Sequence, residues 1–544
     1  MNLPDSLPAP SWVESGARPK DGLDLLGLRQ PAQVISAVLL NGVTTVTPSV
    51  RYLSFRSFIA HSYTQSKLPE DLARFQDYAG RVETAVAFAN LIENPNALGV
   101  LGSTKGKKIL ESSPSSFPLQ PLVDELAVNI YAGPSDRNQL GLSFATDSGI
   151  PGLTKERGLA LARIASTTIS RSELGSRFWK GEAITLANRA QLEELAQYVS
   201  VSAIPEEERE FLTNILIPER PLATDIGRIG TYGTLLQLAQ AKRGRPDDDA
   251  LLVAAIQTDE SISAEFAVTL DGWLRYCVRD LIAVAHEVVF EQVVETLGRF
   301  TDSENYANAD EIVESYVSEL DDQTTLLQEL QLVSQDEDLR QLSFRQLFSR
   351  IQQATRHGRM ESDGLYRWRG ELDELAIIQT ALAARRAGTC AACLLPVSWV
   401  LSLCRSPIDS SLLDGDSDDF LSHQGWARFG LRQVIHPFAQ EFLKEDQSLV
   451  QVISDLTRRT VDQHLRVVWS RLAQDPLRDV AVLNAEGELW GYRTDFSAGR
   501  TASRLRQALN WLQQLKLIND SGLTSDGEIV LKRALSSLRN GVAE

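Results

Sequence analysis

The sequence predicts a mostly α-helical, multi-domain protein with a small α+β domain at its C-terminus. The chain has 544 residues, more than a single hydrophobic core usually holds. Leu, Ala, Gln, Glu and Arg dominate while Gly and Pro are modest, a balance that favours helices. Its hydrophobic content of 43% and charged content of 23% are those of an ordinary globular protein, so we expect packed helices rather than disorder.

Composition shifts along the chain predict five parts. Residues 1–22 are rich in Pro, Ser and Gly and are expected to form an irregular N-terminal arm. Residues 23–300 form a helical body, with an expected subdomain break near 145–150. The polar, acidic stretch 301–309 lacks apolar periodicity and is the expected linker. A helical middle domain then covers 310–475, and the small C-terminal domain covers 476–544.

Two arginines lie in an apolar, aromatic helix near the N-terminus, within Arg51-Tyr-Leu-Ser-Phe-Arg56. One interpretation is a phosphate or partner contact. The alternative, which we favour, is a structural pairing of Arg51 and Arg56 with carboxylates of the next helix, which offers Glu70, Asp71, Asp77 and Glu83.

A long central helix is predicted from about Asp271 to Arg299. On a helical wheel of about 100° per residue its acidic side chains share one face and its apolar side chains the opposite face. One interpretation makes this acidic face metal ligands or a general acid/base, with His286 and Arg279 at its edge. The other, which we favour, makes it the solvated face of an amphipathic helix. The candidate catalytic residues are Asp280, Glu287, Glu291, His286 and Arg279.

Three cysteines lie close together in the middle domain. One interpretation is a zinc site formed by Cys390, Cys393 and Cys404, for which His423 is the nearest fourth ligand in sequence. The surrounding residues are apolar rather than the Gly and polar residues of a zinc knuckle, so buried thiols are the favoured interpretation. No metal or cofactor is expected.

The C-terminal domain begins with a predicted hairpin, Val480–Leu483 and Glu488–Tyr492. A helix follows in which Leu505, Leu509 and Leu512 share an apolar face, with Thr501 or Ser503 as its cap. A short turn leads to Leu523-Thr-Ser-Asp-Gly527, which Leu153-Thr-Lys-Glu-Arg-Gly158 echoes loosely. That echo could begin a second small unit of the same kind.

This order of polar cap, basic first turn, apolar helix, short turn and second helix resembles the second half of a winged helix-turn-helix, over about the last 60 residues. The resemblance implies that the first helix contacts the major groove of duplex DNA, or that the domain contacts a protein instead. The acidic turn Asn519-Asp520-Ser521-Gly522 favours the protein partner. The residues implied are Arg500, Thr501, Ser503, Arg504, Arg506 and Lys516.

The net charge, the cysteine count and the apolar runs of the sequence argue against several classes of function. A net charge of −18 argues against a broad nucleic-acid surface and against an anionic membrane surface, but allows one local basic patch. Four cysteines are too few for a disulfide framework, and no signal peptide or membrane-spanning run is found. We therefore expect a cytoplasmic protein that does not bind membranes.

Around the N-terminal 100 residues, the Arg-Tyr-Leu-x-Phe-Arg helix within a helical body resembles uncharacterised bacterial proteins encoded in anti-phage defence loci. Taken together, we expect a non-enzymatic scaffold or adaptor subunit that binds protein partners and, through its C-terminal domain, DNA. The alternative is a metal-dependent nuclease or other phosphoryl-transfer enzyme with a site built from scattered carboxylates.

Overall fold

The computed structural model confirms a mostly α-helical protein with only small sheets of two or three strands. It describes residues 24–66, 68–112, 115–257, 261–300, 306–318, 324–334, 337–362, 365–370, 372–386, 391–405, 434–474 and 480–540. Within these ranges, no helix has both the length and the apolar character that crossing a membrane requires. The chain divides into two compact units: unit 1 comprises residues 1–32 and 276–501, and unit 2 comprises residues 33–275 and 502–544.

Each unit is therefore built from two separate segments of sequence, unlike the linear division expected above. The division falls inside two helices, α1 (Gln30–Leu39) and α13 (Ala267–Phe300). The expected linker 301–309 is only partly described. Its residues Ala307–Asn308 form strand β5, and Ala309 begins the next helix, so this end of the stretch belongs to the folded body of unit 1.

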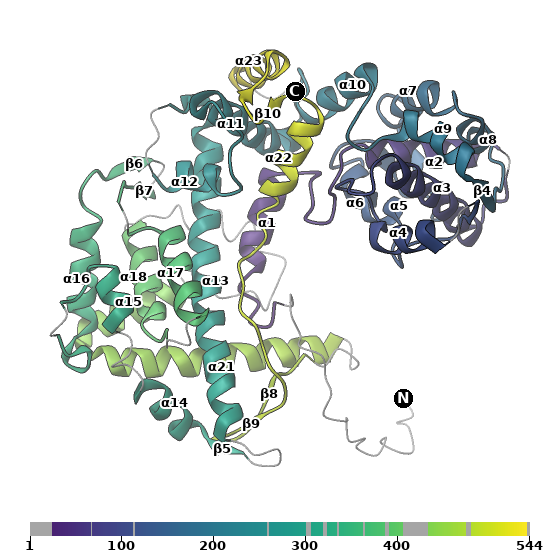
Figure 1. Cartoon of the computed structure of the whole chain (residues 1–544). Helices are drawn as coiled ribbons and strands as arrows, with labels where there is room; N and C mark the ends of the chain where they lie inside the picture. The colour runs from purple at the N-terminus through teal and green to yellow at the C-terminus, as the bar shows by residue number, and fades with distance from the viewer. Residues whose placement is uncertain are drawn as a thin grey trace. The chain divides into compact units, whose positions relative to one another are not determined.

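Unit 1 is a helical cluster around the C-terminal part of α13, with two small antiparallel sheets among its described residues (Figure 1). One has strand order β5-β9-β8, and the other pairs β6 with β7. The helices are α14 (Ala309–Ser318), α15 (Thr324–Glu329), η4 (Leu339–Gln341), α16 (Phe344–Ala354), α17 (Glu374–Arg386), α18 (Leu394–Arg405), α20 (His436–Glu445) and α21 (Leu449–Gln474). The strands are β5 (Ala307–Asn308), β6 (Met360–Ser362), β7 (Leu365–Arg367), β8 (Leu483–Glu486) and β9 (Leu489–Tyr492).

The antiparallel pairing of β8 with β9 confirms a hairpin in this region, with its second strand where predicted. Its first strand is Leu483–Glu486 rather than Val480–Leu483, so most of the expected turn is part of that strand. The hairpin pairs with β5 inside unit 1, whereas the C-terminal helices belong to unit 2. The hairpin expected to open the C-terminal domain is thus packed in a different unit from the helices that follow it.

Unit 2 begins with a group of helices around α2 and α3, which Figure 1 shows gathered together. α2 packs against α7, and α3 packs against α9. The helices are α2 (Tyr52–Gln65), α3 (Leu72–Glu93), α4 (Ser103–Ser112), α5 (Ala127–Ile130), α6 (Ala132–Ser135), α7 (Gly158–Ile169), α8 (Glu173–Trp179), α9 (Arg189–Val199) and α10 (Glu206–Leu216). The strands are β1 (Ser116–Pro118), β2 (Ser143–Phe144), β3 (Gly152–Leu153) and β4 (Leu186–Asn188).

The second group of unit 2 joins chain segments that are far apart in sequence. Helix α11 packs against the C-terminal helix α23, so the C-terminal residues complete their core with a helix about 300 residues earlier. The elements are η1 (Ala223–Asp225), α11 (Ile226–Lys242), α12 (Ala250–Ile256), η2 (Ala264–Phe266), α22 (Leu505–Gln514), β10 (Ile518–Asn519), β11 (Gly522–Leu523) and α23 (Ser525–Asn540).

The junction before α23 explains the Leu-Thr-x-x-Gly pattern. The Thr524 hydroxyl donates to the Lys516 carbonyl at 2.7 Å and accepts from the Gly527 N–H at 3.0 Å, which caps the helix. Lys516 takes a left-handed conformation with φ of 58°. A Cβ on Gly527 would lie 2.1 Å from the Leu517 carbonyl oxygen, so only glycine fits there.

A similar junction occurs before α7, where the sequence echo was noted. The Thr154 hydroxyl donates to the Gly141 carbonyl at 2.6 Å and accepts from the Gly158 N–H at 3.0 Å. Gly141 is left-handed with φ of 69°, and a Cβ on Gly158 would lie 1.9 Å from the Leu142 carbonyl oxygen. In both places a two-residue antiparallel strand pair precedes the helix. Unit 2 therefore contains two hairpin-to-helix junctions of this kind, which differ by one residue in the spacing from threonine to glycine.

The two N-terminal arginines are buried structural residues, but their expected partners on the next helix are wrong. Arg51 donates to both carboxylate oxygens of Glu208 at 3.1 Å and also to two backbone carbonyls near the end of α9. Arg56 donates to the Val128 carbonyl at 2.9 Å and to the Ser143 hydroxyl at 2.8 Å. Each arginine therefore joins segments that lie at least 70 residues away in sequence.

Candidate functional site

Three of the four acidic residues that share a face of α13 are buried, contrary to the solvated face expected from the helical wheel, and only Glu295 near the end of the helix is exposed. The side chains of Asp280, Glu287 and Glu291 are at most 3% exposed. All three lie in unit 1 and face an extended segment of the same unit, residues 498–501, here called the strap. They are separated by seven and four residues, which spreads them by about 10 Å and about 6 Å along the helix axis.

Backbone N–H groups of the strap bind these carboxylates in register. Thr501 N–H donates to Asp280 at 2.8 Å, and Gly499 N–H donates to Glu287 at 3.1 Å. Ala498 N–H donates to Glu291 at 3.1 Å. An extended segment without a neighbouring strand leaves its amides without ladder partners, and the helix carboxylates supply those partners here.

Each carboxylate also has its own arginine. Arg29 makes a two-pronged contact with Glu287, in which its Nε donates to Oε1 at 2.5 Å. Arg385 from α17 pairs with Glu291, and the Arg500 Nε lies 3.3 Å from Asp280 Oδ2. Burial raises the pKa of Glu287 and of Glu291 to about 7 and raises that of Asp280, while the arginines and N–H groups act in the opposite direction.

His286 is held by two neighbours in the core of unit 1. The Trp399 Nε1–H donates to His286 Nε2 at 3.1 Å, which makes Nε2 the acceptor nitrogen. Nδ1 then carries the proton and donates to the Thr460 hydroxyl at 2.8 Å. Burial lowers the pKa of His286 to about 3, so the ring stays neutral. Arg279 is also buried, at 5% exposure.

This arrangement has little capacity for the acid/base or metal chemistry considered for α13. Across the parts of the chain that the structure describes, no group of three or more His, Cys, Asp or Glu side chains is placed to hold a metal ion. Of the proposed cysteine ligands, Cys393 and Cys404 are buried, and Cys390 and His423 lie outside the described residues. Burial raises the pKa of Cys404 to about 11, as expected for an inert core thiol.

The residues predicted to contact DNA or a partner are divided between the units after Thr501. In unit 1, Arg500 pairs with Asp280 and Thr501 is 4% exposed. In unit 2, Arg504 precedes α22 with φ of 66° and donates to the Val43 carbonyl at 2.7 Å. Ser503 is half-buried and Lys516 is exposed.

Helix α22, the predicted recognition helix, is bound along its length to residues 43–50 of unit 2. Gln507 donates to the Thr45 carbonyl at 2.8 Å, and the Trp511 indole donates to the Thr47 carbonyl at 2.9 Å. Gln514 donates to the Pro48 carbonyl at 3.1 Å and accepts from the Val50 N–H at 2.9 Å. Arg506 remains 72% exposed but pairs with Asp248 at 2.7 Å. That these side chains contact DNA stays a prediction.

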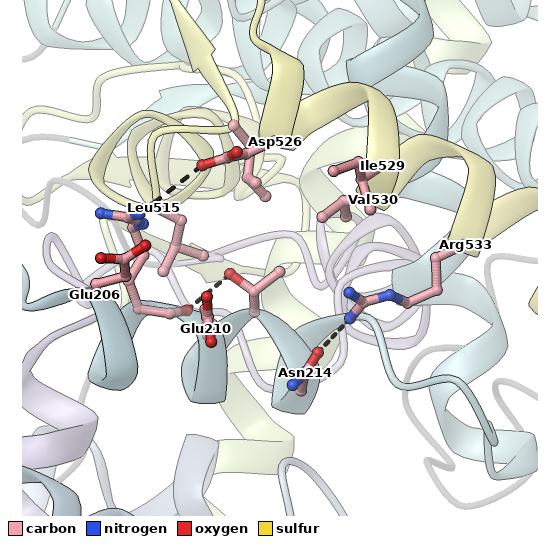
Figure 2. A pocket seen from close by; sticks show the side chains of 11 residues that line it. Glu206, Glu210, Asn214, Leu515, Asp526, Ile529, Val530 and Arg533 are labelled. Atoms are coloured by element: carbon pink, nitrogen blue, oxygen red, sulfur yellow. Dashed lines mark hydrogen bonds and ion pairs between the residues drawn. The ribbon is translucent and has the colours of Figure 1, made fainter.

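A cleft of about 230 Å³ lies elsewhere in unit 2, between α10 and α23 (Figure 2). Its apolar wall comes from the turn after α22 and from α23, and its charged residues come from both α10 and α23. An ion pair, Arg209 with Asp526 at 3.8 Å, and a hydrogen bond from Arg533 to Asn214 connect the two helices. The lining residues are Glu206, Arg209, Glu210, Thr213, Asn214, Leu515, Leu517, Asp526, Ile529, Val530 and Arg533.

Sequence reasoning missed this cleft because its two helices lie more than 300 residues apart. Acidic residues in the first turn of a helix such as α10 are favoured by the helix dipole, and nothing in the local pattern connects them with α23. One signal was present: Ile529 is a large apolar side chain on the polar side of α23, where it is 60% exposed.

Comparisons with known proteins add no assignment: no family model, no curated protein and no solved structure matches the chain.

Proposed function

We propose that this chain is a non-enzymatic helical scaffold of a multi-protein system, which binds a protein partner through the C-terminal helices of unit 2. The observation that carries the proposal is the contrast between α22 and α23. The side chains of α22 bind residues 43–50 of the same unit, whereas α23 presents an open cleft with an exposed isoleucine. A protein partner needs such an exposed apolar anchor surrounded by polar groups.

The charge contacts of α22 weigh against the DNA reading. A recognition helix needs its N-terminal side chains free to reach base edges and phosphates. Arg504 is committed to a backbone carbonyl, and Arg506 is paired with an aspartate. Only Lys516, among the unit 2 residues implied by the winged-helix resemblance, is an exposed cation that has no side-chain hydrogen bond or ion pair in the described part of the chain.

The enzyme alternative has weaker support. A two-metal phosphoryl-transfer centre holds its ions about 3.5–4 Å apart with shared carboxylates. Asp280 and Glu287 are separated by about 10 Å along the helix. Each of these two carboxylates, and Glu291 with them, is also paired with a different arginine, which weakens the negative field that would attract a cation.

The biological setting of the proposal comes from the sequence. The resemblance of the N-terminal region to bacterial proteins encoded in anti-phage defence loci adds a bacterial defence system to the proposal. It assigns no residue of the cleft.

Affinity purification of the tagged chain from its native host, with quantitative mass spectrometry and size-exclusion chromatography, tests this function. We expect a protein partner in fixed stoichiometry that survives nuclease treatment. A chain that elutes alone at its 60.1 kDa under every growth condition would overturn the proposal. So would metal-dependent nucleic-acid hydrolysis that Asp280→Asn abolishes.

A DNA-shift assay over a range of salt concentrations tests the alternative partner. Arg504→Ala and Lys516→Ala are compared with the wild-type chain. We expect no specific binding at physiological salt. DNA would be supported as the partner instead by specific binding in which each removed cation reduces the slope of log K against log salt concentration by about 0.9.

A further inference from the structure

We infer that the cleft between α10 and α23 receives a single lysine or arginine side chain from a segment of the partner protein. This inference rests on the proposed scaffold function and specifies the chemistry of its partner.

The size of the cleft points to one side chain. Sites for drug-sized ligands and cofactors occupy about 300–1,000 Å³. The cleft measures about 230 Å³, below that range. A space of this size fits one long side chain rather than a whole ligand or cofactor.

The apolar wall fits an aliphatic stem. Leu515, Leu517 and Val530 are buried beneath the cleft, and Ile529 is exposed at its side. A lysine or arginine buries its methylene groups along such a surface while its charged head stays at a polar end. Covering Ile529 removes apolar area from water, which favours binding.

Two unpaired carboxylates supply the polar end. Glu206 and Glu210 are one helical turn apart on α10, and both are exposed. Within the described part of the chain their side chains make no hydrogen bond or ion pair. Glu208, which lies between them in sequence, is buried and forms an ion pair with Arg51. A cation between Glu206 and Glu210 would form charge-assisted hydrogen bonds, the stronger class.

The opposite end of the cleft sets the direction of the occupant. Arg533 lies there and donates to Asn214, as Figure 2 shows, while Glu206 and Glu210 lie toward the other end of α10. A second cation beside Arg533 would be repelled, whereas Arg209 at the other end is already paired with Asp526. One positive charge therefore enters with its head toward Glu206 and Glu210. The net charge of −18 also favours approach by a basic segment.

The probe for this inference is a set of fluorescein-labelled octapeptide pools with apolar and small residues at random positions. One central position is fixed as arginine, as citrulline, which has nearly the same shape without charge, or as glutamate. Binding to the purified full-length chain is measured by fluorescence anisotropy. We expect the arginine pool to bind at least about tenfold more tightly than the citrulline pool, and the glutamate pool to bind most weakly.

Matched variants separate the cleft from general charge effects. The double variant Glu206→Gln and Glu210→Gln should reduce binding of the arginine pool to the level of the citrulline pool. Glu207→Gln, on the same helical turn but outside the cleft lining, should leave it unchanged. Ile529→Ser should weaken all pools, and Val268→Ser, at a comparably exposed apolar position of unit 2, should not. Circular dichroism confirms that each variant is folded.

Several outcomes would overturn the inference while leaving the scaffold proposal intact. One is equal binding of the arginine and citrulline pools. Another is an equal loss of binding in Glu207→Gln and in the double variant. A third is a dimer in sedimentation velocity that Ile529→Ser dissociates, since a second copy of the chain would then occupy the cleft. Failure to find any partner by native purification would remove the scaffold proposal itself.

Discussion

The carboxylate row of α13 and the cleft of α10 and α23 use the same residue types in opposite ways. In unit 1, Asp280, Glu287 and Glu291 are buried, and each binds an arginine and a backbone N–H of the strap. In unit 2, Glu206 and Glu210 are exposed and unpaired among the described residues. The carboxylates with perturbed pKa values and close charge contacts are therefore the ones that are least free to bind a partner.

The comparison gives a physical criterion for choosing between candidate sites. A buried charge must be compensated within the fold, because leaving it unpaired costs several kcal/mol. An exposed charge has no such requirement and can exchange water for a partner. The three buried carboxylates of α13 therefore stabilise the fold of unit 1, whereas the exposed carboxylates of the cleft can still bind a partner.

The largest effect should follow from breaking the pair at the centre of the row. Glu287→Ala leaves Arg29 buried without its carboxylate and frees the Gly499 amide. We expect a loss of about 3–5 kcal/mol in the free energy of unfolding of unit 1, typical of removing one partner of a buried ion pair. Urea denaturation followed by near-UV circular dichroism measures this loss, and amide exchange of the strap should rise with it.

A double change distinguishes the ion pair from simple packing. Arg29→Met combined with Glu287→Leu removes both charges at similar volume and should recover most of the stability lost in Glu287→Ala. If Glu287→Ala costs less than about 1 kcal/mol, close to the value of an exposed pair, then Glu287 is not the buried structural carboxylate described here.

A smaller, pH-dependent effect should come from the same residue. Burial raises the folded-state pKa of Glu287 to about 7, although Arg29 opposes this rise. The unfolded value is about 4.3, so the folded chain binds the proton more tightly. The stability from this group is therefore fully present below about pH 4 and is lost as the pH rises through 7.

Glu287→Gln, which cannot titrate, is the control for this pH dependence. The unfolding free energy of the wild-type chain minus that of Glu287→Gln should fall by up to about 3 kcal/mol between pH 4.5 and pH 8, since one pKa unit corresponds to about 1.4 kcal/mol. A difference that stays level or rises over this range would show that the folded pKa is not raised.

Local patterns in the sequence were sufficient for several elements. Helical spacing predicts α13, and alternation with a turn signal predicts the hairpin β8–β9. The Leu-Thr and Gly echo marks the two hairpin-to-helix junctions, because a capping threonine and a glycine at a close backbone contact both act within a few residues. Capping and close contacts of this kind are encoded locally, and so they can be read from a single sequence.

The partners of the buried charged side chains could not be predicted from local patterns. The wheel of α13 separates acidic from apolar residues, yet Asp280, Glu287 and Glu291 on the acidic face are buried too. Arg29, Arg385 and the strap, which come from distant parts of the chain, cover these three carboxylates and leave only Glu295 exposed. The pairing of Arg51 with Glu208 was missed for the same reason. A single sequence gives the residue type that needs a partner, but the fold decides which distant residue satisfies it.

The smallest effect should come from the exposed counterpart of the α13 pairs. Arg506 binds Asp248 at 2.7 Å, a closer contact than that of Arg500 with Asp280, but its side chain is 72% exposed. Water and salt screen this pair, so Arg506→Ala should change the unfolding free energy of unit 2 by no more than about 0.5 kcal/mol. Thermal unfolding at low and high salt measures the effect. A loss above about 2 kcal/mol would contradict the criterion that burial, rather than distance, decides which charge pairs hold the fold.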